Sequence, residues 1–124
     1  MTRLQRLERE CSKLWQEAES KLWRGRCARC KRWCPDLDGA AHHIIRRRVH
    51  ATKFELMNGI YLCTANCHPQ ADQNPDQFMD YLQEYWPPLW TWHVQHRNPD
   101  PVRFTEAFLL ETRTRLKQVV KELG

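Results

Sequence analysis

Four of the six cysteines in this chain of 124 residues form two closely spaced pairs, and paired thiolates are common metal ligands. The pairs, here called the first and the second knuckle, are Cys27 with Cys30 and Cys63 with Cys67. Two such knuckles can supply four thiolates to one tetrahedral zinc ion. Cys34 is close enough to compete for a ligand position, and Cys11 is left over. The alternative is that these cysteines are reduced residues of the core.

Two adjacent histidines, His42 and His43, lie in an apolar segment between the knuckles. If this segment is extended, their side chains point to opposite sides of the backbone. One histidine can then bind a metal while its neighbour addresses a water molecule. His68 and Asp72 are four residues apart, so a helical segment would place them on one face, a common arrangement for two metal ligands.

The elements expected around these residues begin with a helix that runs to about Trp23 and ends before Gly25. Its apolar residues recur at steps of three and four, which predicts a packed face. This stripe consists of Leu4, Leu7, Cys11, Leu14, Ala18 and Leu22. After turn residues at 35–39, two short strands are expected at 41–45 and 59–62, joined by a polar connection.

A short helix is predicted to begin near His68 with Pro69 in its first turn, and Asn74-Pro75 ends it and starts another. That second helix contains Phe78, Tyr81, Leu82 and Tyr85 at helical spacing. Residues 86–101 contain three tryptophans and four prolines, which predicts an irregular aromatic connection. A long amphipathic helix is predicted from Val102 to Leu123.

The composition is that of an ordinary globular chain, with 41% hydrophobic and 28% charged residues. It argues against a collagen-like, low-complexity or mostly disordered protein. Apolar runs are only a few residues long, so no segment is predicted to span a membrane. Residues 1–10 are charged and lack the apolar segment of a secretory signal, which predicts a cytoplasmic protein without disulfides.

Positive charge is concentrated in the first part of the chain. The net charge is +5, with 13 Lys and Arg against 6 Asp and Glu in residues 1–48 and 7 against 9 in residues 49–124. The clustered cations are Arg24, Arg26, Arg29, Lys31 and Arg32, followed by Arg46, Arg47 and Arg48. Cations interspersed with tryptophan suit a nucleic-acid partner. A solvated basic face is the alternative.

Residues 27–72 taken together resemble the HNH endonucleases, a family with the ββα-metal (His-Me finger) fold. The resemblance is carried by C-x2-C, then A-H-H-I-I, then N-x4-C, then a knuckle cysteine followed directly by His. It covers a little over a third of the chain, whose size and layout resemble phage-borne HNH proteins. It implies an α+β, mainly α fold: a small zinc-stapled ββα-metal core flanked by N- and C-terminal helices. The expected organisation is a single domain, with helix 1–24, core 25–74 and helical extension 75–124.

The resemblance also implies roles for individual residues. His42 matches a metal ligand, and His43 matches the general base that activates water. Asn58 matches the residue that holds the loop and orients the catalytic histidine, so His43 and Asn58 are the expected catalytic residues. His68 matches the second metal ligand. The four positions that match structural zinc ligands are Cys27, Cys30, Cys63 and Cys67.

Two positions depart from the family pattern. The second knuckle carries one extra residue, so Cys34 could replace one zinc ligand. The position four after His68, where some members carry another histidine, is Asp72. A carboxylate there suits Mg²⁺ or Mn²⁺ as the catalytic ion, with Zn²⁺ and Ni²⁺ as further candidates.

Phosphodiester hydrolysis needs the chemistry that these residues can supply. A phosphodiester is anionic and has a poor leaving group, so a divalent cation helps by neutralising the charge that grows in the transition state. Neutral imidazole can take a proton from water near neutral pH. Cations that follow the histidine pair could clamp the flanking phosphates. The residues expected to contact DNA are Arg46, Arg47, Arg48, Arg29, Lys31 and Arg32.

The resulting prediction is a metal-dependent endonuclease that hydrolyses duplex or branched DNA, by nicking or by double-strand cleavage. One alternative is a non-catalytic zinc-stapled DNA-binding module in which the histidine pair is structural. Another is an adaptor whose terminal helices dock a larger phage or mobile-element machine. The same helices could support a homodimer, and no membrane partner is predicted.

Overall fold

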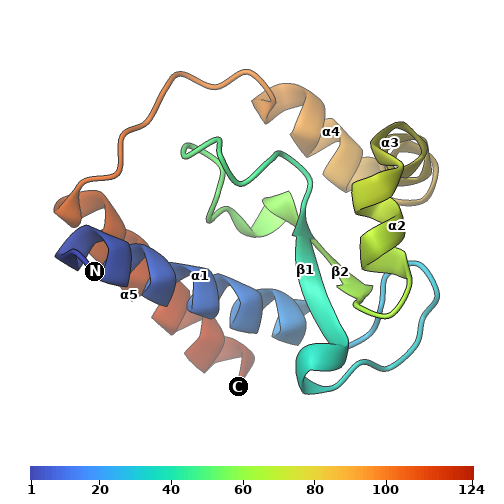
Figure 1. Cartoon of the computed structure of the whole chain (residues 1–124), viewed down its shortest axis with the longest axis horizontal. Coiled ribbons are helices and arrows are strands. Elements are labelled where there is room, and N and C mark those ends of the chain that lie inside the picture. The colour runs from blue at the N-terminus through green and yellow to red at the C-terminus, as the bar shows by residue number, and fades with distance from the viewer.

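The computed structural model describes residues 1–124 as five α-helices around a two-stranded antiparallel sheet (Figure 1). The elements are α1 (Arg3–Leu22), β1 (Gly39–His43), β2 (Gly59–Cys63), α2 (Cys67–Gln73), α3 (Pro75–Tyr85), α4 (Pro87–His96) and α5 (Glu106–Leu123). Short 3-10 turns precede β1 and β2 at Asp36–Asp38 and Leu56–Asn58. The mainly helical α+β class expected from the sequence is confirmed. None of the helices combines the length and apolar composition needed to cross a membrane.

Helix α1 begins at a capping box that the sequence supplies locally. The Thr2 hydroxyl accepts from the Gln5 backbone N–H at 3.1 Å, and the Gln5 side chain accepts from the Thr2 N–H at 2.9 Å. The helix ends before Gly25, as predicted, where the backbone is left-handed with φ of 67°. The buried face differs from the predicted stripe, since Leu4 and Leu22 are exposed. The residues that it buries are Leu7, Cys11, Trp15, Ala18 and Glu19.

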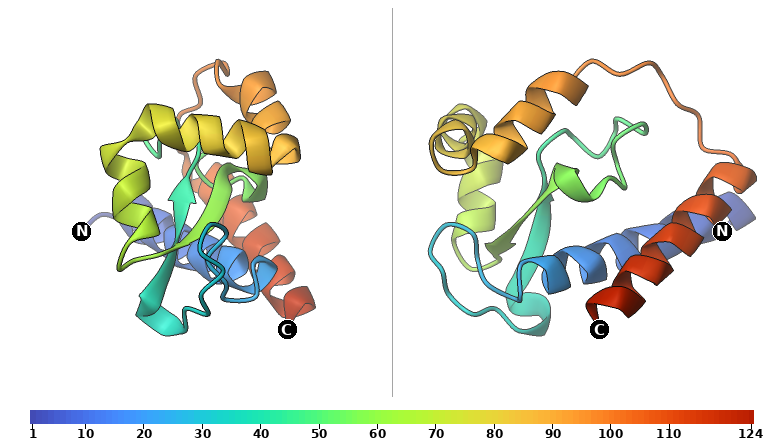
Figure 2. Two further views of the ribbon diagram at one scale, coloured as in Figure 1. Left: turned by 90° about the vertical axis from the view of Figure 1, so that its right-hand side faces the viewer. Right: turned by 180° about the vertical axis from the view of Figure 1, so that it is seen from behind.

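Helices α1 and α5 lie side by side and run in the same direction (Figures 1 and 2). Arg3 pairs with Glu106 at 2.7 Å and Glu10 pairs with Arg113 at 2.8 Å. Each pair joins residues 103 positions apart in the sequence, as expected for two parallel helices. Beneath them Leu109 and Leu116 of α5 join the buried face of α1. The prediction that α5 starts at Val102 is wrong, because Thr105 caps the helix by accepting from the Phe108 N–H at 3.1 Å.

Strands β1 and β2 form a hairpin whose register pairs Gly39 with Cys63 and His43 with Gly59. The expected strands are present, but β1 ends two residues before the predicted limit of Ile45. Residues 44–58 form the connecting loop. Strand β2 is buried along its whole length, between the α2–α4 side and α1. The hairpin therefore brings the second knuckle and the histidine pair to fixed positions on adjacent strands.

Buried apolar side chains form two clusters on either side of the hairpin. The first contains three of the four knuckle cysteines (Cys30 is exposed), Ile60 and Leu62 of β2, and Phe78 and Leu82 of α3. The second joins α1 and α5 to Ala41 of β1 and Phe54 of the hairpin loop. The hairpin contributes to both clusters, which makes it the element that connects the knuckles to the terminal helices.

The segment expected to be an irregular connection contains a helix, which corrects that prediction. Helix α4 spans Pro87–His96, and its two prolines occupy the first helical positions. Prolines are tolerated there because the N–H groups of the first turn have no partner within the helix. Only Pro99 and Pro101 lie in the extended connection, which leads back across the molecule from α4 to α5 (Figure 1). Two of the four prolines in residues 86–101 therefore mark the start of a helix rather than an irregular segment.

A carboxyl group is buried where α1 meets the hairpin. Glu19 is fully buried, and its Oε2 accepts from the Trp23 indole at 3.3 Å while Oε1 has no partner. Gly59 packs directly on it, since a Cβ at Gly59 would lie 2.5 Å from the Glu19 carboxyl carbon. Burial raises the pKa of Glu19 to about 8, and the Trp23 hydrogen bond offsets only part of that shift.

Because the folded protein holds the Glu19 proton that the unfolded chain releases near pH 4.5, stability should fall as pH rises from 4.5 to 8. The slope for one group is at most about 1.4 kcal/mol per pH unit. We expect Glu19→Gln to remove this contribution, so the variant gains stability over wild type as pH increases. Urea unfolding of both zinc-loaded proteins at pH 5, 6, 7 and 8 measures the difference. Parallel pH profiles would contradict it.

Candidate metal centres

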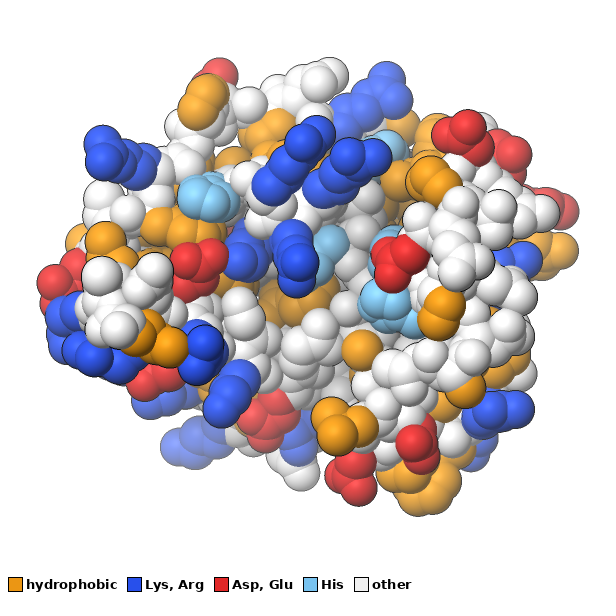
Figure 3. Space-filling model, viewed as in Figure 1, with side chains coloured by type: hydrophobic (Ala, Val, Ile, Leu, Met, Phe, Trp, Pro, Cys, Tyr) orange, Lys and Arg blue, Asp and Glu red, His pale blue; other side chains and the backbone are white.

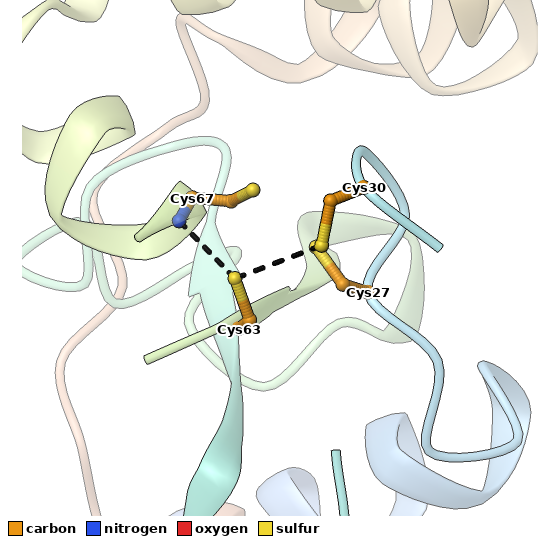
Figure 4. A group of neighbouring side chains, drawn as sticks. All are labelled: Cys27, Cys30, Cys63 and Cys67. Atoms are coloured by element: carbon orange, nitrogen blue, oxygen red, sulfur yellow. Dashed lines mark hydrogen bonds between the residues drawn. The ribbon is translucent and has the colours of Figure 1, made fainter. Parts of the chain in front are cut away.

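The two knuckles meet at the end of β2 and form one four-cysteine cluster (Figure 4). The first knuckle lies in the loop after α1, Cys63 ends β2, and Cys67 begins α2. Their sulfur atoms all lie within 4.8 Å of one another, and the Cys30 and Cys63 sulfurs are 3.8 Å apart. Zinc bonded to four thiolates at about 2.3 Å separates the sulfurs by about 3.8 Å. The donor set and its spacing therefore fit a structural zinc ion.

Backbone donors favour the thiolate at Cys27, whereas burial and the neighbouring thiols raise the pKa of Cys30 and Cys67. Burial raises the pKa of Cys27, but backbone hydrogen bonds from Cys30, Cys63 and Arg29 outweigh this and lower it to about 7. The Cys67 N–H also donates to the Cys63 sulfur at 3.3 Å. Donors of this kind stabilise the negative charge that a metal-binding sulfur carries.

The two other cysteines lie outside this cluster. Cys34 is buried and its thiol donates to the Arg32 carbonyl at 3.4 Å, and it is not part of the four-sulfur group. The Cys11 thiol donates to the Leu109 carbonyl at 3.4 Å, between α1 and α5. The three residues between Cys63 and Cys67 form the turn from β2 into α2, and all four knuckle sulfurs meet, so the geometry does not require Cys34 as a ligand.

A second group of metal-binding side chains lies where β1 faces α2. His42 points from β1 toward α2, where His68 and Asp72 share one helix face. The two Asp72 oxygens lie 3.4 Å from the His42 Nδ1 and 3.2 Å from the His68 Nδ1. Neighbouring ligands of an octahedral ion at about 2.1 Å are about 3.0 Å apart, so these atoms could bind one divalent metal.

Burial holds His42 in the neutral form that a metal ligand requires. It lowers the pKa of His42 to about 4. The neighbouring His68 lowers this pKa further, and the negative charge of Asp72 raises it in part. The His42 ring also contacts Phe78 edge-on, with ring centres 4.9 Å apart. The ligand is therefore both desolvated and held by packing.

The adjacent histidine points the other way and is held by different elements. Its ring stacks on Trp15 of α1, with ring centres 4.1 Å apart and planes 13° apart. The His43 Nε2 lies 3.0 Å from the Lys53 carbonyl. A carbonyl only accepts, so Nε2 carries the proton and Nδ1 keeps a free lone pair. Burial lowers the pKa of His43 to about 4, and this effect outweighs the hydrogen bond to the Lys53 carbonyl, which favours the protonated form. The imidazole is therefore neutral at pH 7.

Asn58 is fully buried and holds the loop between the strands. Its Oδ1 accepts from the Ile45 N–H at 2.6 Å, and its Nδ2 donates to the carbonyls of Ile45 and Thr52, both at 3.0 Å. The same loop carries the Lys53 carbonyl that contacts His43. Asn58 does not line the cleft described next, and its contacts are all with this loop.

A cleft of about 750 Å³ contains both histidines of the pair together with His68 and Asp72. Its rim carries Lys53 and the cations Arg46, Arg47 and Arg48, which are exposed. Figure 3 shows positively charged side chains beside histidines on this face of the molecule. The arrangement combines candidate metal ligands, an unprotonated imidazole nitrogen and positive charge in one opening.

Three of the residues predicted to contact DNA lie elsewhere. Arg29 and Lys31 line a separate groove between the first knuckle and the α3–α4 corner, and Arg32 is exposed in the same loop.

Comparison of the chain with protein-family models, with curated proteins and with solved structures found no match in any of the three. The site is therefore interpreted from its own geometry.

Three contributors to the cleft were not predicted from the sequence. Trp15 lies four residues after Cys11, so it also fits the helical spacing of the apolar stripe, in which the prediction placed Leu14. Lys53 acts through its backbone carbonyl, for which side-chain type gives no signal. Gln16 of α1 accepts from the Ala41 N–H at 2.8 Å and donates to its carbonyl at 3.0 Å, and so fixes β1 against α1.

Proposed function

We propose that this protein is a metal-dependent endonuclease that hydrolyses DNA phosphodiester bonds, as the resemblance to the HNH family implies. The observation that carries the proposal is the position of His43. Its free Nδ1 shares one cleft with the His42, His68 and Asp72 group. A structural metal site alone would need neither the second histidine nor the open cleft.

His43 serves as the general base in this proposal. The Lys53 carbonyl and the Trp15 ring fix the tautomer and the ring plane, so Nδ1 can accept a proton from a water molecule in the cleft. The loop that presents this carbonyl is held by the buried hydrogen bonds of Asn58. General-base catalysis of this kind contributes about 10²- to 10⁴-fold to a rate.

His42, His68 and Asp72 would hold the catalytic ion opposite this base. A bound divalent cation supplies charge neutralisation at the scissile phosphate and at the leaving oxygen. The carboxylate suits Mn²⁺ or Mg²⁺ and the two imidazoles suit Zn²⁺ or Ni²⁺, so these four ions are the candidates. The four-cysteine cluster has a separate, structural role, since it supplies four thiolates and leaves no open position.

Positive charge at the rim supports an anionic polymer as the substrate. None of the three arginines at 46–48 forms an ion pair with a carboxylate of the protein. Guanidinium groups free of partners can bind the phosphates on either side of the scissile bond. This arrangement favours DNA over a small phosphate ester, because a small ester cannot reach all three cations.

A plasmid-nicking assay tests the proposed function. Zinc-loaded protein is incubated with supercoiled DNA in Mn²⁺, in Mg²⁺ and without added divalent ion. We expect open circles only with the added ion, and His68→Ala should raise the half-saturating Mn²⁺ concentration more than about tenfold. The matched control is His96→Ala, an exposed histidine of α4 outside the cleft.

Nicked circles should accumulate before linear DNA, because one such site cuts one strand in each encounter. Failure to cut with any metal, while the protein still binds DNA, would overturn the proposal. That outcome would support the zinc-stapled DNA-binding module instead. Equal loss of activity in His68→Ala and His96→Ala would exclude the cleft as the source of the nicking.

A further inference from the structure

The end of α1 and the loop that follows it carry positive charge that the cleft does not use. Residues 20–35 contain six cations and no carboxylate, namely Lys21, Arg24, Arg26, Arg29, Lys31 and Arg32. None of these cations forms an ion pair within the protein. Zinc bound by four thiolates would carry a net charge of −2, which balances only part of this positive charge. The surplus points to an anionic partner at the first knuckle.

Two of these cations line a groove of about 490 Å³ between the first knuckle and the α3–α4 corner. The Arg29 guanidinium lies 5.1 Å from the Tyr81 ring centre, and the Lys31 ammonium lies 4.9 Å from the Trp86 ring. Hydrogen bonds fix these walls, because Tyr81 donates to the Ala28 carbonyl at 3.0 Å and Trp86 donates to the Tyr81 hydroxyl at 2.9 Å. The groove is therefore preformed.

An exposed aromatic ring borders the same groove. Tyr85 is 62% exposed, and its ring centre lies 5.1 Å from that of Tyr81. No hydrogen bond within the protein involves its hydroxyl, in contrast to the bonded Tyr81 and Trp86. An open aromatic face beside two cations has the chemistry of a site that stacks a base and holds its phosphates.

We propose that this groove binds an unpaired DNA strand, with a base stacked on Tyr85 and phosphates at Arg29 and Lys31. In a duplex the flat faces of the bases are covered by their neighbours, so only an unpaired base can use the Tyr85 ring. A polyglutamate chain could bind the two cations but has no aromatic ring to stack on Tyr85. Taken together with the proposed function, this binding mode gives the nuclease a substrate that contains a single-stranded segment.

Helix α3 places this groove beside the cleft. Phe78 lines the cleft and Tyr85 lines the groove, seven residues further along α3, which corresponds to about 10 Å. One strand can therefore reach from the groove to the cleft within a few nucleotides. The acidic residues Asp80 and Glu84 lie on the adjacent row of α3 and would keep phosphates on the knuckle side. The continuity of one strand through both sites rests on the proposed function, whereas binding in the groove does not.

Fluorescence anisotropy with zinc-loaded protein tests the groove. The probes are a labelled oligothymidylate of about 15 nucleotides and a duplex of the same length, without Mg²⁺ or Mn²⁺. We expect Tyr85→Ala to raise the Kd for the single strand by about 5- to 100-fold, with a change below about twofold for the duplex. Lys31→Gln should weaken single-strand binding and lower its salt slope by about one.

Tyr85→Phe keeps the ring and should keep the affinity. Leu37→Ala, which alters an 89% exposed residue outside the groove, is the matched surface control. Unchanged single-strand affinity in Tyr85→Ala, equal weakening for the duplex, or equal competition by polyglutamate would each overturn the proposal. Tyr85-dependent binding by a protein that cuts no DNA would support the groove and reject the nuclease. DNA cleavage by a protein whose single-strand binding does not depend on Tyr85 would support the nuclease and reject the groove.

Discussion

His43→Ala is expected to lower the rate of DNA cleavage by about 10²- to 10⁴-fold and to leave DNA affinity within about twofold of wild type. The variant loses the only imidazole in the cleft that has a fixed, unprotonated nitrogen outside the group of three candidate ligands. Plasmid nicking under single-turnover conditions measures the rate, and anisotropy without catalytic metal measures the affinity. The cleavage rate should fall without a change in affinity, because in the proposed mechanism His43 contacts water, whereas the arginines at the rim contact phosphate.

A loss of activity through misfolding would give the same rate, so the experiment needs a matched variant. His50 also stacks on an aromatic ring, with its centre 3.8 Å from that of Phe104, but it does not line the cleft. We expect His50→Ala to cut DNA at nearly the wild-type rate. Imidazole added to His43→Ala should restore part of the activity, because the vacated space beside Trp15 opens to the cleft. Wild-type cleavage by His43→Ala would remove this residue from the chemistry.

Residue type and spacing were sufficient to predict the elements that carry strong local signals. Helix α1 has a capping box and ends at a left-handed glycine, and the strands are short apolar segments between turn residues. The structure also brings the four knuckle cysteines together, and it groups His42 with His68 and Asp72. Short spacing accounts for the pairs within one segment, Cys27 with Cys30 and His68 with Asp72, whereas the hairpin brings each pair to its partners on other elements.

Features that depend on tertiary contacts were not accessible in this way. Helix α4 has its prolines at a helix start, and the same prolines in sequence look like a break. Glu19 lies outside the predicted apolar stripe of the first helix, yet the hairpin covers it because Gly59 leaves space for a carboxyl group. Trp15 and Lys53 meet His43 only once α1 and the loop are folded against β1.

Removing one ligand of the four-cysteine cluster should have the largest effect on stability. We expect Cys63→Ser to reduce bound zinc from one ion per chain to nearly none and to lower Tm by more than about 20 °C. Structural zinc contributes about 10–16 kcal/mol to the folding of small modules, which is comparable to the entire stability of a domain. Zinc analysis after gel filtration and thermal unfolding by circular dichroism measure the two changes.

The loss should begin on one side of the hairpin. Cys63 belongs to the cluster with α2, α3 and α4, whereas α1 and α5 are joined by a second cluster and by the Arg3–Glu106 and Glu10–Arg113 ion pairs. Hydrogen exchange in Cys63→Ser should therefore increase in β2 and α2 before it increases in α1 and α5. Uniform exchange throughout the chain would show that the knuckles also support the terminal helices.

Cys34→Ser is the control that identifies the ligands. Cys34 is as buried as Cys63, at 1% exposure for each, but its sulfur is outside the four-cysteine group. The variant places a hydroxyl in the core and should lose some stability, yet it should retain one zinc ion per chain. If Cys34→Ser loses the zinc and Cys30→Ser retains it, Cys34 is the fourth ligand and Cys30, the exposed member of the cluster, is not. Zinc content, rather than Tm, therefore decides between the two arrangements.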